Sequence, residues 1–98
     1  MYTKGEKIVS YIGLGSNLGN REENLLAAIN KMEELEGIIK SKQSSFYEND
    51  PVGYLEQGKF LNGVVEILTL LTPRQLLKEL QKIEIELKRI KLVHWGPR

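Results

Sequence analysis

Apolar residues occur along this chain in two patterns, as short continuous runs and as positions that recur every three or four residues. Residues 8–14, IVSYIGL, form one run that is mainly apolar, and residues 60–70 form another that is rich in Val and Ile. Runs of this length between glycine and polar residues are typical of buried β-strands. A weaker run over residues 38–47 predicts a third strand.

Helical spacing first appears after a glycine-containing turn at residues 15–19. The apolar residues that recur at this spacing are Leu25, Leu26, Ile29, Met32 and Leu35. Asn20 stands before them as an N-cap with Glu23 three residues later, which resembles a capping box. Gly37 occupies the place expected of a C-cap glycine. The pattern therefore predicts a helix between Asn20 and Gly37.

A second helix is predicted after residue 72. Thr72 suits the N-cap, Pro73 the first helical position and Gln75 the third. The apolar stripe that follows consists of Leu76, Leu80, Ile83, Leu87 and Ile90. We expect this helix to run to about Lys88.

The order strand, helix, strand, strand, helix predicts an α/β (α+β) domain, a ferredoxin-like βαββα(β) sandwich. That fold needs a further strand after the second helix, and the pattern of residues 89–98 does not indicate one. We therefore expect one domain over residues 1–98, truncated before its last core strand and incomplete at its C-terminus. An uncovered strand edge along residues 8–14 would then favour self-association.

Composition is that of an ordinary soluble domain, with 41% hydrophobic and 28% charged residues. The net charge of +1 provides no basic field for binding nucleic acid. The absence of cysteine excludes disulfides, thiolate metal sites and a cysteine nucleophile. No apolar run is long enough to span a bilayer, and no secretory signal is evident. We expect a cytoplasmic protein that has no membrane partner.

The segment GLGSNLG leaves a predicted strand and enters a helix, as dinucleotide-binding loops do. Its spacing is Gly-x-Gly-x-x-x-Gly, and no clear βαβ crossover with a ribose-binding acid follows. We interpret these glycines as permitting a tight turn.

Phe60 and Asn62 follow a long polar connection and point to one face of their predicted strand. An aromatic ring beside an amide that both donates and accepts could hold a planar heterocycle. The alternative is that Phe60 is a core residue and Asn62 a hydrogen-bonding residue at the end of the strand.

Gln81 and Glu84 lie three residues apart on the second helix, close to the line of Leu77. Alone, this pair indicates only a solvated helix face.

Arg89, His94, Trp95 and Arg98 lie near the end of the chain. Two arginines with an indole between them could hold a nucleotide, and His94 adds a donor. The alternative is an irregular basic tail that complements the C-terminus of the helix.

Four segments together resemble one enzyme family. They are YIGLGSNLGNREENLLAAI, SSFYENDPVGYLEQGKFLN, TPRQLLKELQKIE and HWGPR, in that order and spacing. The chain resembles the 6-hydroxymethyl-7,8-dihydropterin pyrophosphokinases of folate biosynthesis, which transfer pyrophosphate from MgATP to a pterin alcohol and release AMP. The resemblance implies this activity, with ATP and 6-hydroxymethyl-7,8-dihydropterin as the partners.

The resemblance also implies roles for individual residues. Phe60, Asn62 and Trp95 would bind the pterin, with Asn49 and Val52 contributing backbone groups. The residues implied for ATP are Leu77, Gln81, Glu84, Arg89, Trp95 and Arg98, of which Arg89 and Arg98 would be catalytic.

Magnesium is the cofactor that the resemblance implies, bound by an Asp-x-Asp pair that follows Trp-Gly-Pro-Arg in the family. Its expected ligands lie beyond Arg98, so no residue of this chain is expected to bind metal, and these 98 residues alone would be inactive. Two alternatives are a non-catalytic module that binds a pterin or nucleotide, and an RNA-binding domain of the same βαββαβ plan. The RNA-binding domain requires a basic aromatic strand, which residues 60–69 do not supply.

Overall fold

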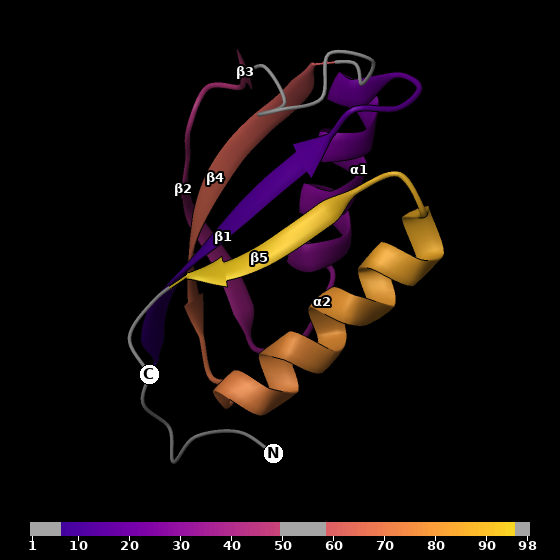
Figure 1. Cartoon of the computed structure of the whole chain (residues 1–98). Helices are drawn as coiled ribbons and strands as arrows, with labels where there is room; N and C mark the ends of the chain where they lie inside the picture. The colour runs from indigo at the N-terminus through magenta and orange to yellow at the C-terminus, as the bar shows by residue number, and fades with distance from the viewer. Residues whose placement is uncertain (1–6, 50–58, 96–98) are drawn as a thin grey trace.

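Two central strands, β1 (Ile8–Ser16) and β4 (Phe60–Thr69), form the antiparallel centre of a single sheet (Figure 1). The computed structural model describes residues 7–49 and 59–95. The remaining elements are α1 (Arg21–Glu33), β2 (Ile38–Gln43), β3 (Tyr47–Asn49), α2 (Pro73–Leu87) and β5 (Lys91–Trp95). The core strands lie in the order β2-β4-β1-β5, and β3 also pairs with β4.

This topology consists of two interleaved split βαβ units. α1 connects β1 to β2 with β4 lying between them, and α2 connects β4 to β5 with β1 lying between them. Every strand pairing in the sheet is antiparallel. The predicted ferredoxin-like arrangement is confirmed.

The expectation that the last core strand is missing was wrong. β5 pairs with β1, so that Tyr11 is opposite Trp95 and Gly15 is opposite Lys91. The five residues KLVHW include a lysine and a histidine, and their polar and apolar residues do not alternate as in a half-buried strand. Their strand conformation comes from pairing with β1, because β-propensity depends strongly on context. β5 covers the edge of β1 from which self-association was expected.

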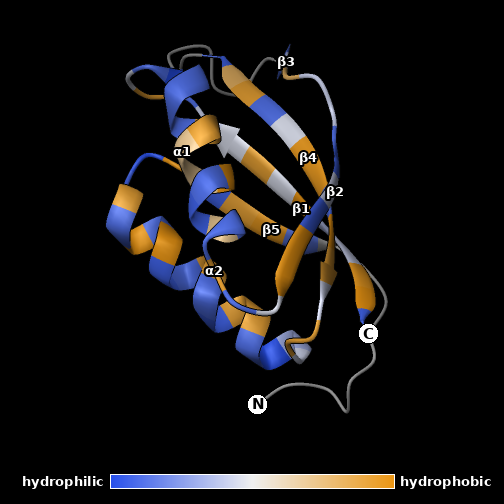
Figure 2. Ribbon diagram, turned by 180° about the vertical axis from the view of Figure 1, so that it is seen from behind, coloured by the Kyte–Doolittle hydropathy of each residue, from blue (hydrophilic) through white to orange (hydrophobic). Residues whose placement is uncertain are grey.

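Alternating residues of the central strands face the two helices and form the core. Figure 2 shows both helices on one side of the sheet, and burial alternates from residue to residue along β4 from Gly63 onward. The most deeply buried large side chains of the core are Ile12, Leu25, Met32, Val65, Ile67, Leu76 and Leu80. No helix covers the opposite face of the sheet within the described ranges (Figure 1). That open face is where a ligand can reach the strands.

Both predicted N-caps are present. The Asn20 side chain accepts a hydrogen bond from the Glu23 N–H at 3.1 Å, and the Thr72 hydroxyl accepts one from the Gln75 N–H at 3.2 Å. Pro73 is the first residue of α2, where its missing N–H costs nothing. The local sequence therefore fixes where each helix begins.

The end of α1 differs from the prediction, whereas α2 ends where it was expected to, at about Lys88. α1 is capped by Glu34 in a right-handed conformation, and Gly37, at φ 83°, lies just before β2. α2 is capped by Lys88, which adopts the left-handed conformation at φ 67° without being glycine. Gly37 therefore shapes the entry into β2 and does not cap the helix.

The strand predicted over residues 38–47 is divided into β2 and β3. Between them Ser44 bonds to Val64 twice, by a backbone N–H to carbonyl bond and by its hydroxyl accepting the Val64 N–H, both at 2.9 Å. Phe46 packs over Gly63, where an added Cβ would lie 2.8 Å from the Phe46 ring. Gly63 thus permits the turn that sends Phe46 toward the core.

In the described part of the chain, neither helix has the length and apolar character that crossing a membrane would require.

Replacing Thr72 tests the cap of α2. Thr72→Ala should lower the free energy of unfolding by about 1 kcal/mol, because the Gln75 N–H loses its acceptor. Thr72→Ser keeps the hydroxyl and should retain most of the stability. Urea denaturation measures both, and an unchanged midpoint in Thr72→Ala would contradict the role of the cap.

Candidate functional site

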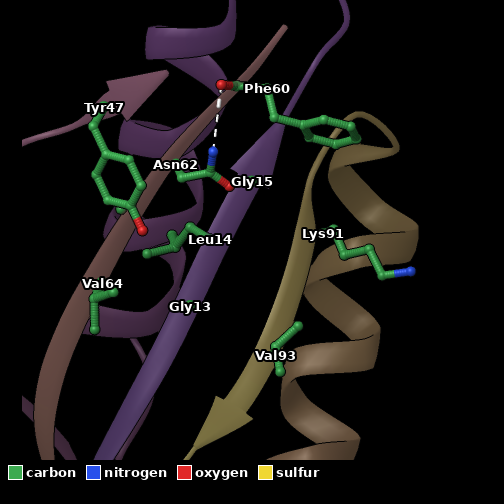
Figure 3. Close-up of a pocket in the computed structure, with 10 residues that line it drawn as sticks. Gly13, Leu14, Gly15, Tyr47, Phe60, Asn62, Val64, Lys91 and Val93 are labelled. Atoms are coloured by element: carbon green, nitrogen blue, oxygen red, sulfur yellow. Dashed lines mark hydrogen bonds between the residues drawn. The ribbon is translucent and has the colours of Figure 1, made fainter. Parts of the chain in front are cut away.

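A cavity of about 300 Å³ opens on the face of the sheet that the helices leave uncovered (Figure 3). Strand alternation places Gly13 and Gly15 of β1 on this face, opposite their pairing partners Val64 and Asn62 of β4. The lining residues are Gly13, Leu14, Gly15, Tyr47, Phe60, Asn62, Gly63, Val64, Lys91 and Val93. Four strands therefore contribute to one depression.

Phe60 and Asn62, the pair singled out from the sequence, both line this cavity. Phe60 is half-buried and lies outside the hydrophobic core, so its interpretation as a core residue was wrong. The Asn62 side-chain amide donates to the Phe60 carbonyl at 3.3 Å. Gly15 lies beneath both, because an added Cβ there would be 3.2 Å from Asn62 Oδ1 and 3.7 Å from the Phe60 ring. Small size at Gly15 keeps the cavity open.

Sequence reasoning did not assign to a site five other side chains of the lining, which are Leu14, Tyr47, Val64, Lys91 and Val93. Tyr47 is the pairing partner of Asn62, and Figure 3 shows Asn62 between the rings of Tyr47 and Phe60. Lys91 and Val93 come from β5, which was interpreted as a tail. Polar and apolar residues do not alternate over residues 91–95, so the sequence alone carried no clear signal for Lys91 and Val93.

A second cavity of about 220 Å³ adjoins the first and shares Gly15, Phe60 and Lys91 with it. Its lining also includes Lys88 and Arg89, so three cationic residues border it. This concentration of positive charge suits an anionic ligand.

Arg89 lies against the turn between β1 and α1. An added Cβ at Gly19 would be 2.5 Å from Arg89 Nη1, and Gly19 has φ 64°. Glycine is therefore needed here both for the turn conformation and for the approach of the guanidinium.

A hydrogen bond from Ser16 holds the main chain of Arg89 next to that turn. The Ser16 side chain is nearly fully buried, and its hydroxyl donates to the Arg89 carbonyl at 2.6 Å. The Asn24 amide donates to Ser16 Oγ at 3.0 Å and to the Leu18 carbonyl at 2.8 Å. This network joins the end of β1, the first turn of α1 and Arg89, the second residue after α2.

Leu77, Gln81 and Glu84 lie on α2, apart from the first two cavities. Leu77 lines a groove of about 500 Å³ together with Arg74, Val93 and His94. Gln81 is exposed, and Glu84 Oε2 accepts the Leu92 N–H at 2.8 Å. None of the three cavities described here, all lined by residues within the described ranges, brings Leu77, Gln81 and Glu84 together with Arg89.

The other predicted residues are described only in part. The backbone of Asn49 pairs with Phe60, and that of Trp95 pairs with Tyr11. Val52 and Arg98 lie outside the described residues.

A polar cluster continues the open face beyond the first cavity. The Tyr11 hydroxyl donates to Glu66 Oε2 at 2.8 Å, and the Ser41 hydroxyl donates to Glu66 Oε1 at 2.8 Å. The hydrogen bond from Ser41 lowers the pKa of Glu66 most, and the hydrogen bond from Tyr11 lowers it further. The pKa of Tyr11 is raised by its hydrogen bond to Glu66 and by the negative charge of the Glu66 carboxylate. The cluster connects β1, β2 and β4, and its Tyr11 is also the backbone pairing partner of Trp95.

Among residues 7–49 and 59–95, no group of three or more His, Asp or Glu side chains is placed to hold a metal ion.

The family model for 7,8-dihydro-6-hydroxymethylpterin-pyrophosphokinase matches residues 11–98. The chain belongs to this family.

The names of similar proteins agree with this family assignment. A 2-amino-4-hydroxy-6-hydroxymethyldihydropteridine pyrophosphokinase of Bacillus subtilis is 49% identical over 92% of this chain and 54% of its own length. The protein of the same name from Haemophilus influenzae is 43% identical over 93% of this chain and 57% of its own length. A folic acid synthesis protein of Pneumocystis carinii is 46% identical over 99% of this chain and 14% of its own length. The chain thus spans about half the length of the two pyrophosphokinases.

The Tyr11–Glu66–Ser41 cluster should make stability depend on pH. The pKa of Glu66 lies below its ordinary value of 4.5 in the folded state. The stabilisation is therefore present above pH 4.5 and is lost as the pH falls through the lowered pKa. Thermal unfolding between pH 3 and pH 6 should show a smaller acid-dependent loss in Glu66→Gln than in the wild type. Glu33→Gln, at the exposed end of α1, controls for the loss of one negative charge, and identical pH profiles for all three would contradict this prediction.

Removing the Ser16 hydroxyl should be costly. Ser16→Ala removes the donor to the Arg89 carbonyl and one of the two acceptors of the Asn24 amide, which should lower the free energy of unfolding by about 1–3 kcal/mol. Ser45→Ala, at an exposed serine, should change it by less than about 0.5 kcal/mol. Denaturant titration compares the two, and equal stabilities would refute the network.

Proposed function

We propose that the protein containing this domain transfers pyrophosphate from ATP to 6-hydroxymethyl-7,8-dihydropterin, releasing AMP, in folate biosynthesis. The observation that carries the proposal is the pair of adjoining cavities on the open face. One offers an aromatic ring beside an amide, and the other is bordered by three cations. The family match and the names of the relatives support the same activity.

The pterin ring would occupy the larger cavity. Its volume of about 300 Å³ is at the lower limit for small-molecule sites, as suits a bicyclic heterocycle. Phe60 would stack on the ring, and Asn62 would pair with its donor and acceptor edge. Backbone groups of Asn49 and Val52, together with Trp95, complete the proposed pterin set.

The phosphates of ATP would face the smaller cavity. Arg89, with Lys88 and Lys91 beside it, would offset their negative charge, and Arg98 is proposed for the same role. Leu77, Gln81 and the Glu84 carboxylate are proposed for the rest of the nucleotide. Since Glu84 Oε2 already accepts the Leu92 N–H, the proposal for Glu84 concerns its other oxygen.

The proposed reaction is an in-line attack of the pterin hydroxymethyl oxygen on the β-phosphorus of ATP. The bond from that phosphorus to the oxygen of AMP breaks, and no covalent enzyme intermediate is needed. The side chains of this chain would act by holding both substrates in line and by stabilising charge on the phosphates. Phe60 and Asn62 orient the nucleophile, and Arg89 orients the electrophile.

Magnesium is implied by the resemblance, but the described residues do not fit a magnesium site. No described residue is therefore assigned as a metal ligand. A cytoplasmic location remains a proposal, as does the absence of nucleic-acid and membrane partners.

A non-catalytic pterin- or nucleotide-binding module is the less favoured alternative, because the relatives cited above are named as pyrophosphokinases.

Substitutions in the larger cavity test the pterin assignment. Phe60→Ala and Asn62→Ala should each weaken binding of 6-hydroxymethylpterin by about 1–3 kcal/mol, through loss of stacking or of paired hydrogen bonds. Calorimetric titration measures the affinity, and far-ultraviolet circular dichroism checks that each variant is folded.

Asn30→Ala, at an exposed position of α1, is the matched control and should bind the pterin as the wild type does. Unchanged affinity in both cavity variants would refute the assignment of these residues. A wild-type chain that binds neither 6-hydroxymethylpterin nor ATP would refute the proposed function itself.

A further inference from the structure

Arg21, the first residue of α1, connects three separate parts of the chain. Its Nη1 donates to the Lys59 carbonyl oxygen at 2.7 Å, and its Nη2 forms an ion pair with the Glu48 carboxylate. Glu48 belongs to β3, and Lys59 immediately precedes β4. One guanidinium therefore binds both partners of a strand pair that its own helix does not belong to.

That strand pair carries three of the side chains around the larger cavity. Its register places Tyr47 opposite Asn62 and Asn49 opposite Phe60. β3 has only three residues, too few to hold its place by backbone pairing alone. The Lys59 carbonyl is adjacent to Phe60, so the bond from Arg21 acts on the backbone that positions the Phe60 ring.

Arginine suits this task because its planar guanidinium has five donors in a fixed arrangement. One edge can meet a carboxylate while another donor reaches a carbonyl. Lysine carries the same charge on a single nitrogen and cannot match this arrangement. The Arg21 side chain is not in the lining of either cavity described above, so the influence proposed here is exerted through the backbone and the carboxylate that it binds.

We propose that Arg21 is a positioning residue for the pterin cavity, and this inference rests on the proposed function. Through Glu48 and the Lys59 carbonyl, Arg21 holds β3 against the start of β4. This fixes the separation of the Tyr47 and Phe60 rings on either side of Asn62. The cavity is thereby kept at the width of a planar bicyclic ring.

An ordinary surface ion pair would differ from a positioning residue in its effect on ligand affinity. The side chains of Arg21 and Glu48 are 30% and 46% exposed, and pairs of this kind contribute little to stability. A merely superficial pair would leave ligand affinity unchanged. A positioning role predicts loss of pterin affinity with little change in ATP affinity, since Arg21 does not border the cationic cavity.

The test compares Arg21→Gln, Arg21→Lys and Glu48→Gln with Lys31→Gln. The control breaks the exposed Lys31–Glu86 pair, 2.7 Å long, which joins α1 to α2. In calorimetric titrations, Arg21→Gln should weaken 6-hydroxymethylpterin binding by about five- to tenfold, as expected for losing charged hydrogen bonds. ATP affinity should change by less than about twofold, because its cavity is left intact.

Arg21→Lys and Glu48→Gln should each lose part of the pterin affinity, and Lys31→Gln should lose none. Unchanged pterin affinity in Arg21→Gln would overturn the proposal, as would an equal loss in Lys31→Gln or an equal loss of ATP binding.

Amide hydrogen exchange provides a second readout that needs no ligand. In Arg21→Gln, amides of residues 47–49 and 60–62 should exchange faster, while those of residues 91–95 should not. Unchanged exchange would overturn the positioning role even if affinity fell. A wild type that binds no pterin would refute the proposed function, whereas the exchange data would still show whether Arg21 orders the strand pair.

Discussion

The antiparallel pairing of β1 with β4 is the constraint on which the rest of the molecule depends. Nine residue pairs connect the two strands, from Ile8 opposite Thr69 to Ser16 opposite Leu61. A slip of one residue would exchange the core face for the open face along a whole strand. Burial of Ile12 against the helices therefore determines that Gly15 and Asn62 meet on the other side. Core and cavity are two consequences of one register.

Sequence patterns were sufficient wherever one face of an element is buried along its length. The long strands, both helices and the caps at Asn20 and Thr72 follow from apolar spacing and local hydrogen bonding. The same alternation placed Phe60 and Asn62 together. These features are local, so no knowledge of distant pairing partners was needed.

The features that sequence could not supply are those decided by a distant partner. β5 is a strand because β1 offers it an edge, and β3 is one because β4 continues past the end of β2. Tyr47 and Lys91 reach the cavity only through these short pairings. The residues proposed to bind ligand on α2 were placed on one helix face correctly, yet Glu84 turned out to bond to the backbone of Leu92.

That bond belongs to a recurring arrangement around the site. Ser16 donates to the Arg89 carbonyl, Glu84 accepts the Leu92 N–H, and Arg21 donates to the Lys59 carbonyl. In each case a side chain of a helix or a long strand bonds to a backbone group of another segment. That backbone group belongs to a residue that lines a cavity or is adjacent to one that does. Backbone partners make the geometry insensitive to which side chain the bound residue carries. The cavity-lining residues Phe60 and Arg89 are thus positioned by backbone bonds that do not depend on their own side chains, so different residues set the shape of the cavities and the chemistry of their lining.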